Sequence, residues 1–125
     1  MKKKDIVIVS QHPAFSGLLA GALQDNYRLV SFDNIRPALD YIYNAIPGLL
    51  IIDIAGGDPF TTNILNTLKS DPIFNQLPVL AALEDAGEIP RWDSLLVEDY
   101  ILKGDLEREG LARVDLCIVR SERVV

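Results

Sequence analysis

Five short apolar runs alternate along this chain with segments in which apolar residues recur at helical spacing. A short apolar run bounded by turn-forming residues predicts a buried strand. Strands that alternate with helices in this way predict a parallel sheet with helices on both faces. We therefore expect an α/β fold, a doubly wound sheet of five parallel strands. The expected strands are residues 5–9, 27–32, 49–53, 78–83 and 98–103.

Local signals mark the intervening helices. Pro13 is suited to the first turn of the first helix, and Asp33 or Asn34 can cap the second. The last helix is expected from Leu106 to about Arg120, and a short helix that starts near Pro90 is expected before the last strand. Residues expected on the inner helix faces include Phe15, Leu18, Leu19, Ala38, Leu39, Ile42, Val114, Cys117 and Ile118.

Composition excludes several classes of protein. A formal net charge of −6 over 125 residues argues against binding to nucleic acid or to an anionic membrane surface. No apolar run approaches the roughly 20 residues of a membrane span, and the charged start does not resemble a signal peptide. The single cysteine, Cys117, excludes an internal disulfide. We expect one cytoplasmic domain, residues 1–125, that forms the N-terminal part of a longer protein, although a complete single-domain chain fits the same pattern.

Two charged residues follow apolar runs directly. Asp53 ends the run from residue 49, and Lys103 ends the run from residue 99. In an open parallel sheet, ligands bind outside the carboxyl ends of the strands. The sequence therefore predicts a carboxylate and an ammonium group in one crevice. We expect them to form an ion pair in the resting state, which would neutralise Asp53.

Three segments resemble bacterial response-regulator receiver domains. They are the strand that ends at Asp53, the sequence Leu68-Lys69-Ser70-Asp71-Pro72 followed by Leu77-Pro78-Val79-Leu80, and Tyr100-Ile101-Leu102-Lys103. The resemblance covers nearly the whole chain and implies a flavodoxin-like fold. It also implies that Asp53 is the candidate phosphoacceptor for a histidine kinase, that Lys103 contacts the phosphoryl group, and that Tyr100 is the aromatic residue that reports activation.

The chain departs from the receiver pattern at several positions. Ser10 and Gln11 stand where receivers usually carry two acidic residues, and Leu83 stands where a hydroxyl residue ends the fourth strand. Glu84 replaces a small residue, and Gly104 replaces a proline. Magnesium prefers carboxylate oxygens, so only weak Mg²⁺ binding at Asp53 is expected and no cofactor is firmly implied. Leu83 has no donor for a phosphoryl oxygen.

These features predict an atypical, non-enzymatic receiver domain with weak or absent phosphorylation of Asp53. It would regulate an attached output domain or a signalling partner, such as a histidine kinase, through protein contacts. A homodimer through the face formed by the fourth helix, the fifth strand and the last helix is also expected. The alternatives are a small-ligand binder or enzyme on a flavodoxin-like fold, and a purely structural dimerisation unit.

Several other polar residues have two interpretations. Glu84 and Asp85 either complete a metal site with Asp53 or belong to a solvated acidic loop. With Glu88 and Asp93 they form an acidic stretch that would repel phosphodonors or attract a basic partner. His12 is the only histidine, so a place in the turn that starts a helix explains it better than metal binding. Trp92 and Tyr100 either form an interface patch or cover the sheet edge.

Overall fold

A computed structural model of the chain describes residues 5–53, 59–72, 74–85, 87, 97 and 99–122. Its five strands form one parallel sheet in the order β2-β1-β3-β4-β5. This arrangement confirms the predicted doubly wound α/β sheet. The strands are β1 (Asp5–Val9), β2 (Arg28–Phe32), β3 (Leu49–Asp53), β4 (Val79–Leu83) and β5 (Asp99–Leu102).

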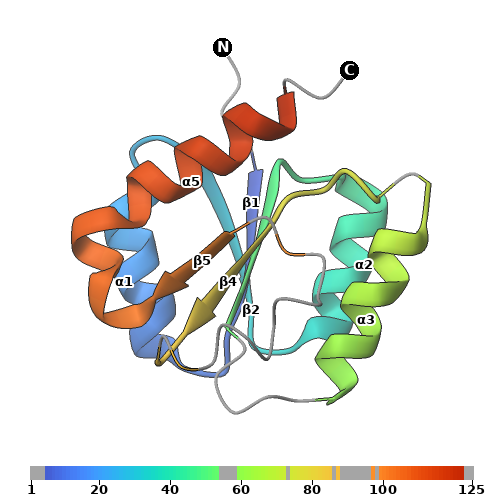
Figure 1. Cartoon of the computed structure of the whole chain (residues 1–125), viewed down its shortest axis with the longest axis horizontal. Helices are drawn as coiled ribbons and strands as arrows, with labels where there is room; N and C mark the ends of the chain where they lie inside the picture. The colour runs from blue at the N-terminus through green and yellow to red at the C-terminus, as the bar shows by residue number, and fades with distance from the viewer. Residues whose placement is uncertain are drawn as a thin grey trace.

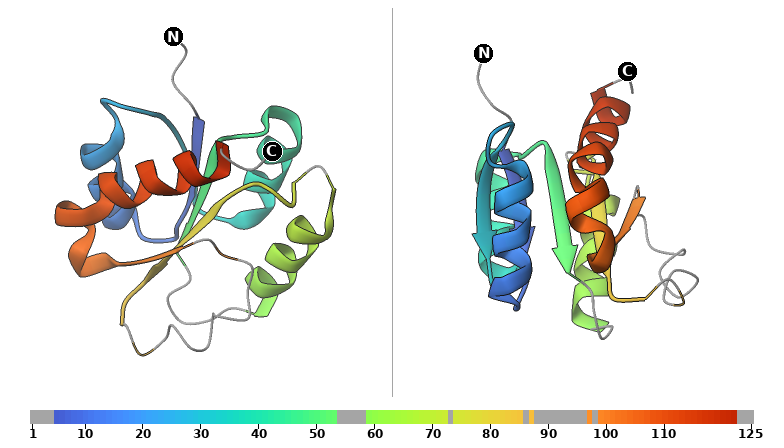
Figure 2. Two further views of the ribbon diagram at one scale, coloured as in Figure 1. Left: turned by 45° about the horizontal axis from the view of Figure 1, so that its top comes forward. Right: turned by 90° about the vertical axis from the view of Figure 1, so that its left-hand side faces the viewer.

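Helices cover both faces of the sheet (Figure 1). On one face lie α1 (Pro13–Leu23) and α5 (Leu106–Glu122), and on the other lie α2 (Ile35–Ala45) and α3 (Pro59–Ser70). A short 3-10 helix, η2 (Lys103–Asp105), links β5 to α5. The side view in Figure 2 shows the layers.

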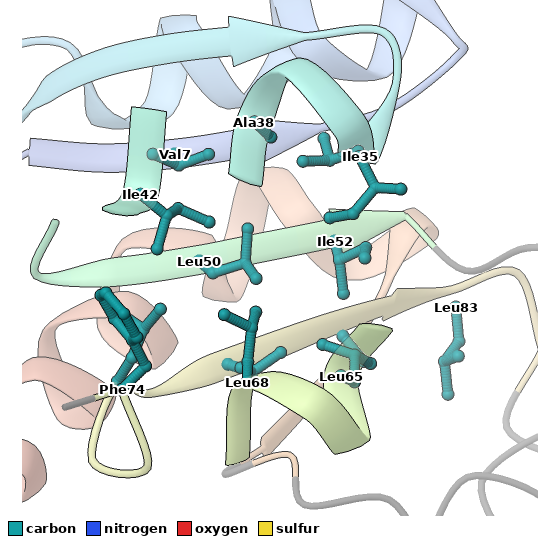
Figure 3. Packing of buried hydrophobic residues seen from close by; sticks show 14 residues of the cluster. Val7, Ile35, Ala38, Ile42, Leu50, Ile52, Leu65, Leu68, Phe74 and Leu83 are labelled. Atoms are coloured by element: carbon teal, nitrogen blue, oxygen red, sulfur yellow. The ribbon is translucent and has the colours of Figure 1, made fainter. Parts of the chain in front are cut away.

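The core consists of two apolar clusters, because strand side chains point alternately to the two faces. In β3, Leu49 and Ile51 lie in the cluster beneath α1 and α5. Leu50 and Ile52 lie in the cluster beneath α2 and α3 (Figure 3). The neighbouring strands contribute alternate residues to the two clusters in the same way. The position of a residue along its strand therefore decides which face of the sheet its side chain lies on.

Within the described residues, the helix predictions hold with one refinement and one correction. Asn34, rather than Asp33, caps α2, since its side chain accepts a hydrogen bond from the Arg36 N–H at 2.9 Å. Cys117 is buried core, as predicted. Leu18 was predicted to face inward but is 45% exposed, because the Phe15 and Leu19 side of α1 faces the sheet instead. Within the described residues, no helix is long and apolar enough to cross a membrane.

Some predictions fall on residues that the structure does not describe. These include the short helix expected to start near Pro90, the aromatic Trp92, and the acidic residues Glu88 and Asp93. The predictions at those positions therefore remain expectations from the sequence.

Ile46 ends α2 in a left-handed backbone conformation, with φ 44° and ψ 81°. A β-branched residue is strained there, whereas glycine is not. Because Ile46 is 58% exposed, it has little packing to lose. Ile46→Gly is therefore expected to raise the free energy of unfolding by about 1 kcal/mol in urea denaturation. Ala45→Gly, one residue earlier in helical conformation, should lower it by about 0.5–1 kcal/mol. Equal losses in both variants would contradict the strain.

Candidate functional site

Strand alternation brings three polar side chains to one place at the carboxyl edge of the sheet. Ile8, Ile51 and Ile101 point into the cluster beneath α1 and α5. The residues two positions later are Ser10, Asp53 and Lys103, which extend the same face beyond the core. The sequence placed Asp53 and Lys103 at strand ends, and the structure brings both to this edge.

The Asp53 carboxylate accepts hydrogen bonds from two donors. Lys103 Nζ and Ser10 Oγ each lie 2.8 Å from Asp53 Oδ2. The Asp53 side chain is only 2% exposed, so water contributes little to its solvation. The predicted ion pair between Asp53 and Lys103 is confirmed. Because the pair lies in a crevice shielded from water, the Lys103 ammonium is the cation that balances the charge of the Asp53 carboxylate.

Ser10 is held as a donor toward Asp53. It directly follows β1, the strand beside β3, and its backbone N–H donates to the Phe32 carbonyl at 3.0 Å. Its hydroxyl oxygen accepts a hydrogen bond from the His12 backbone N–H at 3.0 Å. The hydroxyl in turn donates to Asp53 Oδ2 at 2.8 Å, a much shorter contact than the 3.4 Å to its other possible acceptor, the His12 carbonyl oxygen. Where receivers usually have an acid, this chain adds a neutral donor and no charge.

His12 lies in the turn that starts α1, as predicted. It occupies the N-cap position of the helix and its side chain is exposed. Its role in the site comes from its backbone N–H, which orients Ser10. Gln11, the second position where an acid is usual, is also exposed.

Lys103 contacts a second carboxylate and an aromatic ring. Its Nζ lies 3.0 Å from Glu84 Oε1 and 5.0 Å from the centroid of the Phe15 ring. Burial lowers the pKa of Lys103, but its hydrogen bonds to Asp53 and Glu84 and both carboxylate charges raise it, leaving the pKa above its ordinary value of 10.5. The resulting stabilisation is present below pH 10.5 and is lost as the pH rises through the higher folded-state pKa.

Leu83 and Tyr100 lie on the opposite side of the sheet from Asp53. Leu83 ends β4 and is fully buried in the cluster with Ile52 and Leu65 (Figure 3). Tyr100 is half-buried and packs against the same cluster. The structure therefore divides the predicted site residues into a polar group around Asp53 and an apolar group around Leu83.

The donor set around Asp53 suits Mg²⁺ poorly. One oxygen of the Asp53 carboxylate, Oδ2, already accepts from an ammonium and a hydroxyl, whereas Mg²⁺ needs several oxygen ligands in near-octahedral geometry. Glu84 pairs with Lys103, and Asp85 Oδ1 accepts from the Gly87 N–H at 2.7 Å. In the part of the chain that the structure describes, no three acidic, histidine or cysteine side chains gather to hold a metal ion.

Sequence reasoning missed two contacts of this site. Ser10 was seen only as a missing acid, and Glu84 as a metal ligand or a solvated residue. The available signal was positional, since both residues directly follow strands whose carboxyl ends share the edge with Asp53.

Comparison with protein-family models and with curated proteins finds no match. Solved structures do match over nearly the whole chain. A candidate response regulator from Chloroflexus aurantiacus has a TM-score of 0.83 at 24% identity, covering 95% of this chain and 100% of that chain. The receiver domain of a signal-transduction histidine kinase from Syntrophus aciditrophicus has a TM-score of 0.80 at 22% identity, covering 98% and 95%.

A CheY-like response-regulator receiver domain from Methanospirillum hungatei has a TM-score of 0.81 at 17% identity, covering 98% of each chain. At these identities the likeness concerns the fold. The chain has the fold of response-regulator receiver domains, and the resemblance predicted from the sequence is confirmed at that level.

Proposed function

We propose that this chain is an atypical receiver domain of two-component signalling in the cytoplasm. It regulates an attached output domain or a partner through protein contacts, with weak or absent phosphorylation of Asp53. The observation that carries this proposal is that Asp53 Oδ2 is paired with the Lys103 ammonium and hydrogen-bonded by the Ser10 hydroxyl, each at 2.8 Å. No enzymatic reaction is proposed for the domain.

Phosphoryl transfer to Asp53 would be slow in such a site. The reaction depends on positioning and on neutralising the charge of the transferred group, much of which Mg²⁺ supplies. Asp53 is the one carboxylate at the positions where receivers usually carry acids, because Ser10 and Gln11 replace the other two. The Asp53 carboxylate that would attack a phosphodonor is already hydrogen-bonded. Weak Mg²⁺ binding would also leave the charge of the transferred group poorly neutralised.

Leu83 removes the usual route from the site to Tyr100. In the receiver pattern, a hydroxyl residue at the end of the fourth strand contacts a phosphoryl oxygen, and the aromatic residue then changes rotamer into the vacated space. Leu83 has no donor, and its fully buried side chain fills the cluster against which Tyr100 packs. Phosphate-driven rearrangement of Tyr100 is therefore disfavoured, which supports signalling through protein contacts instead.

The contact surface that we propose lies at β5 and α5. Between them is a hollow of about 210 Å³ bordered by Tyr100, Glu109 and Arg113, among others. Arg113 pairs with Asp99 through two contacts of 3.1 Å, which fixes one wall of the hollow. A histidine kinase, another signalling protein or a second copy of the chain could contact this face. A second copy would bind through a two-fold axis.

The proposal is tested by two-dimensional amide NMR during titration with Mg²⁺ and then beryllofluoride, a mimic of the phosphoryl group. We expect no saturable shifts at Asp53, Leu83 or Tyr100. Asp53→Asn is the control, because a shift that persists in this variant does not arise at the phosphoacceptor. Large saturable shifts in the wild-type chain that vanish in Asp53→Asn would overturn the proposal.

A further inference from the structure

The two carboxylates on Lys103 are in very different environments. Asp53 is 2% exposed, whereas the Glu84 side chain is 58% exposed. Asp53 is the last residue of β3, whereas Glu84 is the first residue after β4. An ion pair with one exposed partner is weak, because water solvates that partner almost as well. Of the two carboxylates, Glu84 is therefore the one whose place on Lys103 another anion can take, and Asp53 is not.

Glu84 is positioned by strand register. Leu83 and Leu102 are partners across β4 and β5, so Glu84 and Lys103 are the next residues on both strands. Their side chains consequently meet at the crevice that holds Asp53. The register of β4 and β5 therefore determines this contact.

We propose that Glu84 is a tethered carboxylate that closes a small-oxyanion site at Lys103, the ligand class being inorganic phosphate and similar tetrahedral oxyanions. The proposal deepens the proposed function, because it gives a physical reason why this crevice would not respond to phosphate. A carboxylate oxygen at 3.0 Å from Lys103 Nζ takes the place that an oxygen of an external anion would occupy.

The charges and donors in the crevice support this assignment. Asp53, Lys103 and Glu84 together carry one net negative charge, so an entering anion is repelled. Without the Glu84 charge the group is neutral, and the ammonium has a donor that no longer faces a carboxylate. A tethered group also competes at an effective concentration in about the millimolar range. A free anion at lower concentration does not displace it.

The test is a titration with inorganic phosphate at constant ionic strength. Binding is monitored through the amide NMR shifts of Ser10, Leu83 and Lys103. We expect Glu84→Gln to bind phosphate at least about tenfold more tightly than the wild-type chain, through loss of both competition and repulsion. Glu84→Ala should show the same gain, which separates the effect from any new contact made by the amide.

Asp85→Asn is the matched control. It removes the same charge one residue along the chain, from a side chain whose Oδ1 accepts a hydrogen bond from Gly87. Its phosphate affinity should change by less than about twofold, since screened surface charge has little effect. Equal gains in Asp85→Asn and Glu84→Gln would show a general charge effect and would overturn the proposal, as would absence of a gain in either Glu84 variant.

A double variant extends the test to the charge of Asp53. Asp53→Asn combined with Glu84→Gln leaves one net positive charge in the crevice, so phosphate should bind more tightly still. A weaker affinity than in Glu84→Gln alone would contradict an anion site at Lys103. These outcomes are separate from the proposed function, which fails only if the wild-type chain responds to beryllofluoride.

Discussion

Lys103→Met is expected to lower the free energy of unfolding by about 3 kcal/mol, because it leaves a buried carboxylate without its cation. Asp53 is 2% exposed and cannot recover its lost partner from water. Methionine keeps much of the apolar stem of lysine, but it removes the ammonium that lies 5.0 Å from the centroid of the Phe15 ring. The loss is measured by urea denaturation at neutral pH, with the wild-type chain as reference.

A double-mutant cycle identifies the source of that loss. Asp53→Asn alone should change the free energy of unfolding by less than about 1 kcal/mol, since the amide oxygen still accepts from Ser10 and Lys103 remains paired with Glu84. Lys103→Met combined with Asp53→Asn should then lose less than Lys103→Met alone. If the two losses instead add, the unpaired carboxylate is not the cause, and Lys103 acts through packing.

The fold was accessible from sequence because parallel strands buried on both faces read as continuous apolar runs. Residues 49–53 and 5–9 are of this kind, and both strands have the predicted bounds. The orientation of α1 was harder to predict. Leu18 and Leu19 are adjacent and equally apolar, and the packing of α1 on the sheet, which leaves Leu18 outside, is a tertiary property that the local pattern does not contain.

The site was accessible only in part for a similar reason. A charge directly after an apolar strand is a local signal, and it identified Asp53 and Lys103. The contacts of Ser10 and Glu84 depend on which strands are neighbours, since β1 lies beside β3 and β4 beside β5. Strand order and register cannot be predicted from any single segment of the sequence. A hydroxyl and a carboxylate therefore appeared as departures from a pattern, when they are partners of the two residues that were identified.

Restoring two acids at positions 10 and 11 is expected to have the second large effect. Ser10→Asp combined with Gln11→Asp would place a new carboxylate within the crevice where the Ser10 hydroxyl now donates to Asp53 at 2.8 Å. Like charges in a buried site repel each other and cannot be fully solvated. Without divalent cations, we expect this variant to lose roughly 3 kcal/mol of unfolding free energy in urea denaturation.

Millimolar Mg²⁺ should recover most of this loss, because three carboxylates then provide the oxygen ligands that the ion prefers and binding to the folded state alone stabilises it. Ser10→Asn combined with Gln11→Asn matches the shape without the charge, and its stability should not depend on Mg²⁺.

A diacidic variant as stable as the diamide one in the absence of metal would mean that the crevice tolerates a second carboxylate. A diacidic variant that Mg²⁺ does not rescue would mean that Lys103, paired with Asp53 and Glu84, excludes the metal whatever stands at positions 10 and 11. Recovery by Mg²⁺ would instead assign the weak metal binding to the replacement of two acids by Ser10 and Gln11, with the rest of the receiver architecture still able to hold the ion.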